Sequence, residues 1–253
     1  ESLTNAEAAI YAIGIIREFP RRGITYENLH YQSIVRMVNH AQSIGVKRFL
    51  LISAHGAAAK GTAYQTTKFR AEEHLKDSGL AWTIFRPSIV FGDPQGGVEF
   101  CTMLRDKIIE SPFPAPLFFK GADIARAGTF RFSPVHVGDV AKAVVRSLDF
   151  PSAVNTVYDL GGPVVIDWKT LIATIAGACG RKKASLPAPA AAVSLAAALF
   201  ERFSWFPVTR DQIAMLLEGN VCDGSRAFAD FGIDPTPFDA AHLGYLKKHG
   251  KPR

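Results

Sequence analysis

Three short apolar runs with helix-like segments between them constrain the fold of this chain most strongly. The runs occupy residues 8–13, 49–52 and 82–85, and the segments between them span 26–43 and 64–77. Consecutive apolar side chains are typical of strands that are buried on both faces of a parallel sheet. The alternation of strands and helices therefore predicts an α/β fold, a doubly wound parallel sheet covered by helices.

The ends of these runs predict where a ligand would bind. Right-handed crossovers bring the carboxyl ends of parallel strands to one edge of the sheet, and ligands bind at that edge. Ser53 follows the second run and Pro87 follows the third. We therefore expect both residues at a ligand-binding edge.

Composition excludes some classes of function. The chain has 253 residues, 48% of them hydrophobic, enough for one large domain or a domain with a lobe. Its net charge of +6 is compatible with a phosphate-bearing cofactor, with an anionic membrane surface or with a mildly basic enzyme. The acidic residues are interspersed and no basic arm is present, so no nucleic-acid partner is expected.

The cysteines indicate a reducing compartment. Cys101, Cys179 and Cys222 are far apart and odd in number, which fits neither a disulfide framework nor a zinc motif. We expect them to be small buried side chains, and we predict no metal site. The chain has no signal peptide and no convincing membrane-spanning run, so a cytoplasmic location is expected.

Tyr64 and Lys68 are the strongest candidates for chemistry. Residues four apart on a helix share one face. A neighbouring ammonium favours the phenolate, so we expect Lys68 to lower the pKa of Tyr64 and to let the phenol exchange a proton near neutral pH. The alternative without a function is that Tyr64 and Lys68 form an exposed surface pair. The position between two strand-like runs favours a functional role.

Other polar residues are weaker candidates. His55 lies near the expected edge of the sheet, although a solvated loop histidine is the simpler interpretation. His136 is expected to pack in the core, and Arg86 to form a structural ion pair. Asp139 is interpreted as the N-cap of a helix over 140–147, and Asp167 as the cap of a helix that ends at 178.

Five segments together resemble a known family. They are residues 10–14, 46–53, 64–73, 83–92 (TIFRPSIVFG) and 134–141 (PVHVGDVA). Their order is similar to that of the atypical and extended short-chain dehydrogenase/reductases, the NAD-dependent epimerase/dehydratase family. The tail at 206–212 and 231–233 is closer to one branch, the NDUFA-nine-like accessory subunits of respiratory complex I.

This resemblance implies a Rossmann-like fold and an NAD(P) cofactor, with NADP slightly favoured. Tyr64 would be the general acid/base, and Lys68 would lower its pKa and hold the nicotinamide ribose. Ser53 would orient the substrate, although many relatives place that serine one position later, at Ala54. His30 falls where extended members carry an asparagine that supports the lysine. The remaining cofactor contacts implied are Ala12, Ile13 and Gly14 near the adenosine half, and Pro87, Ser88 and Ile89 along the nicotinamide.

The resemblance also suggests how the chain is divided. We expect a dinucleotide-binding domain over 1–147 and a smaller substrate lobe over 148–253, with 92–135 partly interleaved. The glycine fingerprint G-x-x-G-x-x-G, which holds a pyrophosphate on a helix N-terminus, is absent from the sequence. The match starts just before the family's fourth strand, so roughly the first 70–80 residues of the nucleotide-binding half are expected to lie outside this chain. A fragment is favoured over a true half domain, and cofactor binding by this chain alone is expected to be weak.

The segment 184–206 suggests a second class of function. It follows Arg181, Lys182 and Lys183, is rich in alanine, and ends in aromatic residues. Such a segment suits a membrane interface or a protein partner, but we favour the alternative that it forms a core helix of the lobe. Two functions therefore stay open. One is an enzyme with a small-molecule substrate, and the other is a non-catalytic NADPH-binding subunit peripheral to a membrane complex.

Overall fold

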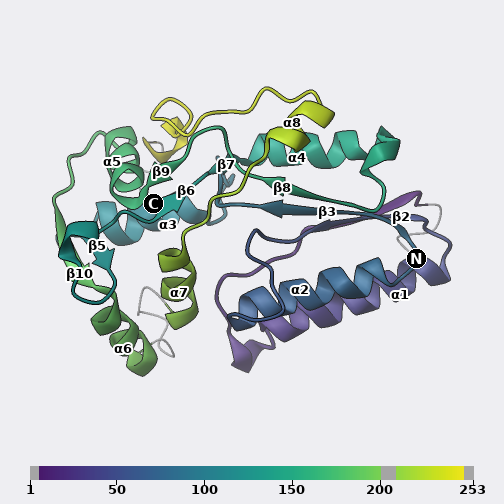
Figure 1. Cartoon of the computed structure of the whole chain (residues 1–253), viewed down its shortest axis with the longest axis horizontal. Helices are drawn as coiled ribbons and strands as arrows, with labels where there is room; N and C mark the ends of the chain where they lie inside the picture. Colours follow the sequence, from purple (N-terminus) through teal and green to yellow (C-terminus); the bar gives the residue numbers. More distant parts are fainter. Residues whose placement is uncertain (1–5, 201–208, 248–253) are drawn as a thin grey trace. The chain divides into compact units, whose positions relative to one another are not determined.

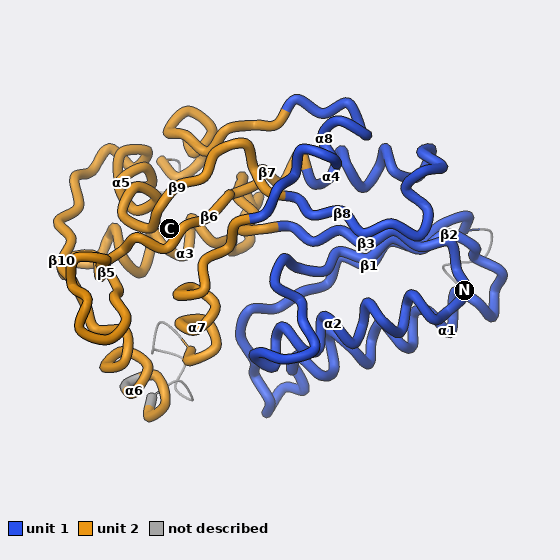
Figure 2. The backbone as a smooth tube through the Cα atoms, in the orientation of Figure 1, with its two compact units in different colours: residues 1–87, 140–160, 222–234 blue, residues 88–139, 161–221, 235–253 orange. Residues whose placement is uncertain are grey.

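The computed structural model describes residues 6–200 and 209–247. The chain forms two compact units, each assembled from three separate stretches (Figure 2). Unit 1 comprises residues 1–87, 140–160 and 222–234, and unit 2 comprises 88–139, 161–221 and 235–253.

A four-stranded parallel sheet forms the centre of unit 1. Its order is β1-β2-β3-β8, with β1 at Ala8–Tyr11, β2 at Arg48–Ile52, β3 at Ala81–Pro87 and β8 at Thr156–Leu160. All three pairings are parallel, and Leu50 lies in register with both Ile10 and Thr83. The parallel α/β sheet expected from the apolar runs is confirmed.

Helices cover both faces of this sheet (Figure 1). The helices α1 (Ser33–Ser43) and α2 (Ala63–Lys76) lie side by side on one face, and α4 (Val137–Arg146) and α8 (Ser225–Asp230) cover the other. The expected helix over 26–43 is present, but its first part is a π-helical segment, Glu27–Gln32. Ile34, Val38 and Leu75 from α1 and α2 pack on Phe49 and Ile84 of the sheet.

The described part of unit 2 contains three two-stranded sheets and several helices. The paired strands are β4 (Val90–Phe91) with β7 (Val135–His136), β5 (Ala115–Phe119) with β10 (Ser185–Pro189), and β6 (Arg131–Phe132) with β9 (Ile166–Asp167). The helices are α3 (Phe100–Leu104), α5 (Trp168–Ala178), α6 (Ala190–Phe200) and α7 (Arg210–Glu218), with a π-helical segment at Arg105–Ile109. The core of this unit surrounds Trp168, whose indole N–H donates to the Pro116 carbonyl over 2.8 Å.

Short 3₁₀ turns connect several of these elements. They are Pro20–Arg22, Ile124–Arg126, Ser147–Asp149, Pro151–Ala153 and Gly244–Lys247.

The division differs from the expected boundary between 147 and 148. The stretch after 147 includes β8, which returns to unit 1 because it pairs with β3, with Thr83 opposite Thr156. The prediction for Asp139 is wrong, because α4 already begins at Val137 and the Asp139 carboxylate accepts a hydrogen bond from the Thr236 amide, 2.7 Å away. Asp167 does cap α5, by accepting from the Thr170 amide.

The segment 184–206 also differs from the expected core helix. Its first part is the strand β10, and the helix α6 begins only at Ala190. Leu195 and Leu199 on α6 are 66% and 59% exposed, whereas Ala197 is buried. The preference for a core helix is therefore wrong for these two leucines. Residues 201–206 of the segment lie outside the described residues. Within the described part of the chain, no helix is both long enough and apolar enough to cross a bilayer.

Candidate functional site

The helix α2 begins with a capping box that fixes the position of Tyr64. The Thr62 hydroxyl accepts from the Gln65 amide, and the Gln65 side chain accepts from the Thr62 amide. Gly61 precedes this cap at a φ of +153°, and a Cβ there would lie 2.4 Å from the Gln65 side-chain oxygen. The cap therefore favours glycine at 61 and places Tyr64 in the first turn, one turn before Lys68.

Lys68 carries a buried ammonium at the carboxyl ends of β1 and β2. Its side chain is 4% exposed, and Nζ donates to the carbonyls of Ile52 (3.1 Å) and Ile13 (3.5 Å). Its third N–H has no acceptor among the described residues. A Cβ on Gly14 would lie 3.6 Å from this ammonium. Burial lowers the pKa of Lys68 to about 8, against an opposing effect of Glu72.

Tyr64 is packed among aromatic rings. Its ring meets His30 edge-on at 5.1 Å and Tyr26 edge-on at 5.7 Å. Its hydroxyl forms no hydrogen bond with any described residue. Burial raises the pKa of Tyr64 to about 12, so the expectation that Lys68 lowers it is wrong for this structure. The physical reason is that Tyr64 loses solvent while the Lys68 ammonium is directed at backbone carbonyls.

His30 packs against the Tyr64 ring as a neutral, buried imidazole. It is 1% exposed, and its Nε2 accepts from the Ile15 amide over 3.0 Å. Burial, followed by the charge of Lys68, lowers the pKa of His30 to about 3. A neutral ring whose Nε2 accepts must carry its proton on Nδ1. That buried Nδ1 has no hydrogen-bond partner within the described residues.

Ser53 is engaged in a different network. Its hydroxyl, 4% exposed, donates to the carboxylate of Glu72, which is fully buried. Glu72 also accepts three further bonds from Arg86, two from Nε over 3.0 and 3.2 Å and one from Nη2. The ion pair expected for Arg86 is thus present. Because the Ser53 hydroxyl already has this partner, its geometry does not favour the substrate-orienting role, and Ala54 beside it has no hydroxyl.

The remaining predicted cofactor residues are divided between the two units. Ala12, Ile13 and Gly14 follow β1, and Pro87 ends β3, so these four belong to unit 1 with Tyr64, Lys68 and His30. Ser88 and Ile89 begin unit 2. There the Ser88 hydroxyl donates to the Ser133 carbonyl, and the Ile89 carbonyl accepts from the Val135 amide.

The structure also assembles a cluster that the sequence did not predict. His55 Nδ1 lies 3.3 Å from Asp159 Oδ1, and Cys222 completes a group of potential ligand atoms that all lie within 4.8 Å of one another. Hydrogen bonds to Asp159 and then to Cys222 raise the pKa of His55 to about 9. His55 and Asp159 are 104 residues apart, so no local spacing signals the cluster.

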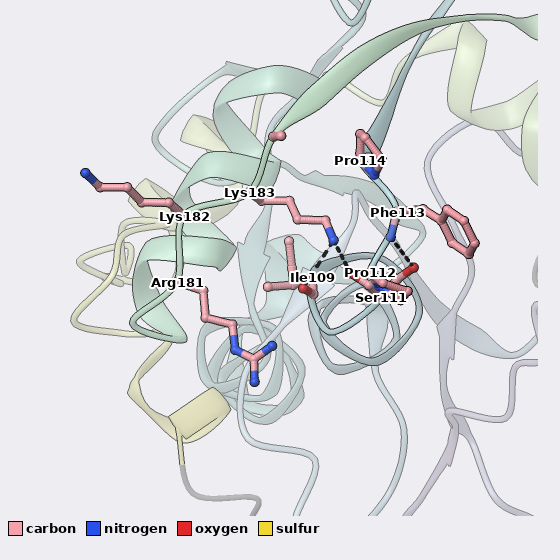
Figure 3. A pocket seen from close by; sticks show the side chains of 9 residues that line it. Ile109, Ser111, Pro112, Phe113, Pro114, Arg181, Lys182 and Lys183 are labelled. Atoms are coloured by element: carbon pink, nitrogen blue, oxygen red, sulfur yellow. Dashed lines mark hydrogen bonds between the residues drawn. The ribbon is translucent and has the colours of Figure 1, made fainter.

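Unit 2 contains a shallow pocket of about 390 Å³ (Figure 3). Arg181, Lys182 and Lys183 line it together with Phe113. Lys183 already donates to the carbonyls of Ser111 and Ile109, and Phe113 is 75% exposed. The pocket presents positive charge and apolar surface but no group suited to acid/base chemistry, so it is a weaker candidate than the α2 site.

Known proteins that resemble this chain are consistent with a nucleotide site in unit 1. Residues 1–110 match the family model for NAD(P)H-binding. The 40 kDa subunit of mitochondrial NADH-ubiquinone oxidoreductase from Neurospora crassa is 22% identical over 252 residues, 98% of this chain and 63% of that subunit. A UDP-glucose 4-epimerase from Vibrio cholerae is 25% identical over 184 residues, 65% of this chain and 53% of that enzyme. Residues 1–110 therefore correspond to an NAD(P)H-binding family domain.

A solved structure shows the same fold. The UDP-glucose 4-epimerase of Thermotoga maritima, solved with UDP-glucose, matches with a TM-score of 0.69 and 16% identity, over 98% of this chain and 78% of that enzyme. The Rossmann-like α/β fold is therefore confirmed. The chain spans only 63% of the length of the Neurospora crassa subunit.

Proposed function

We propose that the protein binds NAD(P)H at the carboxyl ends of β1 and β2 and acts as an oxidoreductase or a sugar-nucleotide epimerase/dehydratase. The observation that carries this proposal is the buried Lys68 ammonium beside Gly14, with one N–H that no described residue accepts. Lys68 forms no direct ion pair, and a buried cation of this kind is costly unless a ligand completes its hydrogen bonds. Ribose hydroxyls are acceptors of the required kind.

The residues around Lys68 suit the same ligand. The His30 Nδ1–H is a second buried donor without a partner in the described part of the chain. The Tyr64 hydroxyl forms no hydrogen bond with a described residue, so it is available to a ligand. A bound nicotinamide supplies hydride transfer. Tyr64 would move the proton to or from a substrate oxygen, and Lys68 would hold the ribose.

Cofactor binding is tested by calorimetric titration of the full-length protein. NADH and NADPH are titrated separately, and we expect NADPH to bind somewhat more tightly. Lys68→Met should weaken binding at least tenfold. Lys76→Met on the same helix is the control, because Lys76 forms a partly exposed ion pair with Glu73. Equal affinity of the two variants would contradict the proposed site.

A second candidate is a non-catalytic NADPH-binding accessory subunit of a membrane respiratory complex. Three observations favour it: the Ser53 hydroxyl is engaged by Glu72, the pKa of Tyr64 is raised, and Leu195 and Leu199 are exposed. Similarity to the Neurospora crassa subunit also supports this second candidate. This candidate predicts retained nucleotide without turnover. Steady oxidation of NAD(P)H with a carbonyl substrate, or net epimerisation or dehydration of a sugar nucleotide, would exclude it.

A further inference from the structure

Three chemically different ligand groups converge in unit 1. His55 lies in the loop after β2, Asp159 lies on β8, and Cys222 begins the stretch that leads into α8. Their ligand atoms all lie within 4.8 Å of one another. The side chains of His55 and Asp159 are 30% and 43% exposed, and Cys222 is a partly exposed cysteine outside any disulfide. The cluster is thus accessible to an ion from solvent.

The spacing matches a tetrahedral metal site. Zinc binds imidazole nitrogen and carboxylate oxygen at about 2.0–2.2 Å and thiolate sulfur at about 2.3 Å. Tetrahedral angles then separate neighbouring ligand atoms by roughly 3.3–3.7 Å. The distance between His55 Nδ1 and Asp159 Oδ1 is 3.3 Å, and the 4.8 Å limit leaves Cys222 only a small movement to make.

The charges of the cluster also favour a cation. With the thiol ionised, Asp159 and Cys222 supply two negative charges, which balance one divalent ion. Both acidic ligand atoms lie within 4.8 Å of the His55 imidazole, so their charges and the ring nitrogen point at one common position. Arg86, the register partner of Asp159, is paired mainly with the buried Glu72, and its charge interacts more weakly with Asp159.

We propose that His55, Asp159 and Cys222 bind a divalent transition-metal ion of the zinc class. Nitrogen, oxygen and sulfur donors together are the set that such borderline ions accept. Three protein ligands leave the fourth tetrahedral position to a water molecule. The bound ion would link Cys222 to the loop after β2 and to β8. The sequence predicted no metal site because the three ligands come from distant segments.

The first test uses Co²⁺ as a spectroscopic probe of the chain freed of metal by a chelator. The native chain should bind one equivalent and show a thiolate-to-cobalt charge-transfer band that Zn²⁺ abolishes. Cys222→Ser should lose the band, whereas Cys179→Ser should keep it, because Cys179 follows α5 in unit 2. A spectrum without this band, or a band that survives Cys222→Ser, would overturn the proposal.

The second test needs no change at Cys222. Zn²⁺ affinity is measured by competition with a chromophoric chelator, and His55→Gln and Asp159→Asn should each lower it by at least the roughly 10–100-fold seen for outer-shell partners. In the native chain, Zn²⁺ should also slow alkylation of Cys222, read by mass spectrometry. Unchanged alkylation, or unchanged affinity in both variants, would show that the cluster is held by hydrogen bonds alone.

Discussion

Replacing Glu72 by glutamine should destabilise unit 1 far more than any exposed charge change on the same helix. Glu72 is fully buried and accepts from the Ser53 hydroxyl and from two nitrogens of Arg86. Its negative charge also stabilises the buried Lys68 ammonium. Glu72→Gln keeps the volume and one accepting oxygen but leaves two cations without their anion.

The expected loss in the free energy of unfolding follows from the burial of the Glu72–Arg86 ion pair. Removing one partner of a buried ion pair costs about 3–5 kcal/mol. Because glutamine still accepts one hydrogen bond, we expect about 3 kcal/mol, roughly two orders of magnitude in the unfolding equilibrium constant. Glu73→Gln is the matched control, because Glu73 pairs with Lys76 at the surface with side chains 46% and 30% exposed. Such pairs contribute about 0–1 kcal/mol.

Hydrogen exchange of the β2 and β3 amides is the appropriate measurement, because it reports on unit 1 alone. Urea unfolding followed by circular dichroism supplies the global value. If Glu72→Gln and Glu73→Gln lower the free energy of unfolding equally, the buried network does not hold α2 to β3. The structural role of the Ser53 hydroxyl in that network would then be refuted as well.

Three other perturbations probe the lysine, the tyrosine and the exposed leucines. The pKa of Lys68 is about 8 in the folded chain against an ordinary 10.5, so the unfolded chain binds one more proton between these values. Relative to Lys68→Met, the native free energy of unfolding should therefore rise by up to about 3 kcal/mol from pH 8 to pH 10.5; parallel pH profiles would contradict this. In an active enzyme Tyr64→Phe should lower turnover by about 10²–10⁴-fold with cofactor affinity nearly unchanged, and an unchanged rate would exclude Tyr64 as the acid/base. Replacing Leu195 and Leu199 by serine should leave thermal stability almost intact, because both are exposed, while reducing co-sedimentation with anionic vesicles; a large loss of stability would show that they are buried.

The fold was predictable because its signals are local. The runs that became β2 and β3 are apolar at consecutive positions, and Leu50 and Ile84 are fully buried as such runs require. The Tyr64–Lys68 pair was predictable for the same reason, since a spacing of four residues on one helix fixes a common face whatever surrounds it.

The electrostatics of the site were not predictable, because burial is a property of the assembled unit. No sequence pattern measures how much solvent Tyr64 loses among His30 and Tyr26, and that loss sets its pKa. Nor does any sequence pattern show that the Ser53 hydroxyl, which follows β2, bonds to the Glu72 carboxylate on α2. The cluster of His55, Asp159 and Cys222 was the least predictable feature of the site. Its three residues come together only because β8 and the 222–234 stretch belong to unit 1.

The two halves of the proposed chemistry make different demands on the site. Holding a ribose requires only a buried donor at the strand ends, which Lys68 supplies while its own position is fixed by two backbone carbonyls. Moving a proton requires in addition that the pKa of Tyr64 fall from about 12 toward neutrality. Within the described residues no cation lowers the pKa of the phenol, so that fall must come from positive charge brought by the cofactor or from Lys68 turning toward Tyr64. Oxidised cofactor carries a positive nicotinamide and reduced cofactor does not. The pKa of Tyr64 should therefore depend on the redox state of the bound nucleotide in an enzyme, and should stay high in an accessory subunit that retains NADPH.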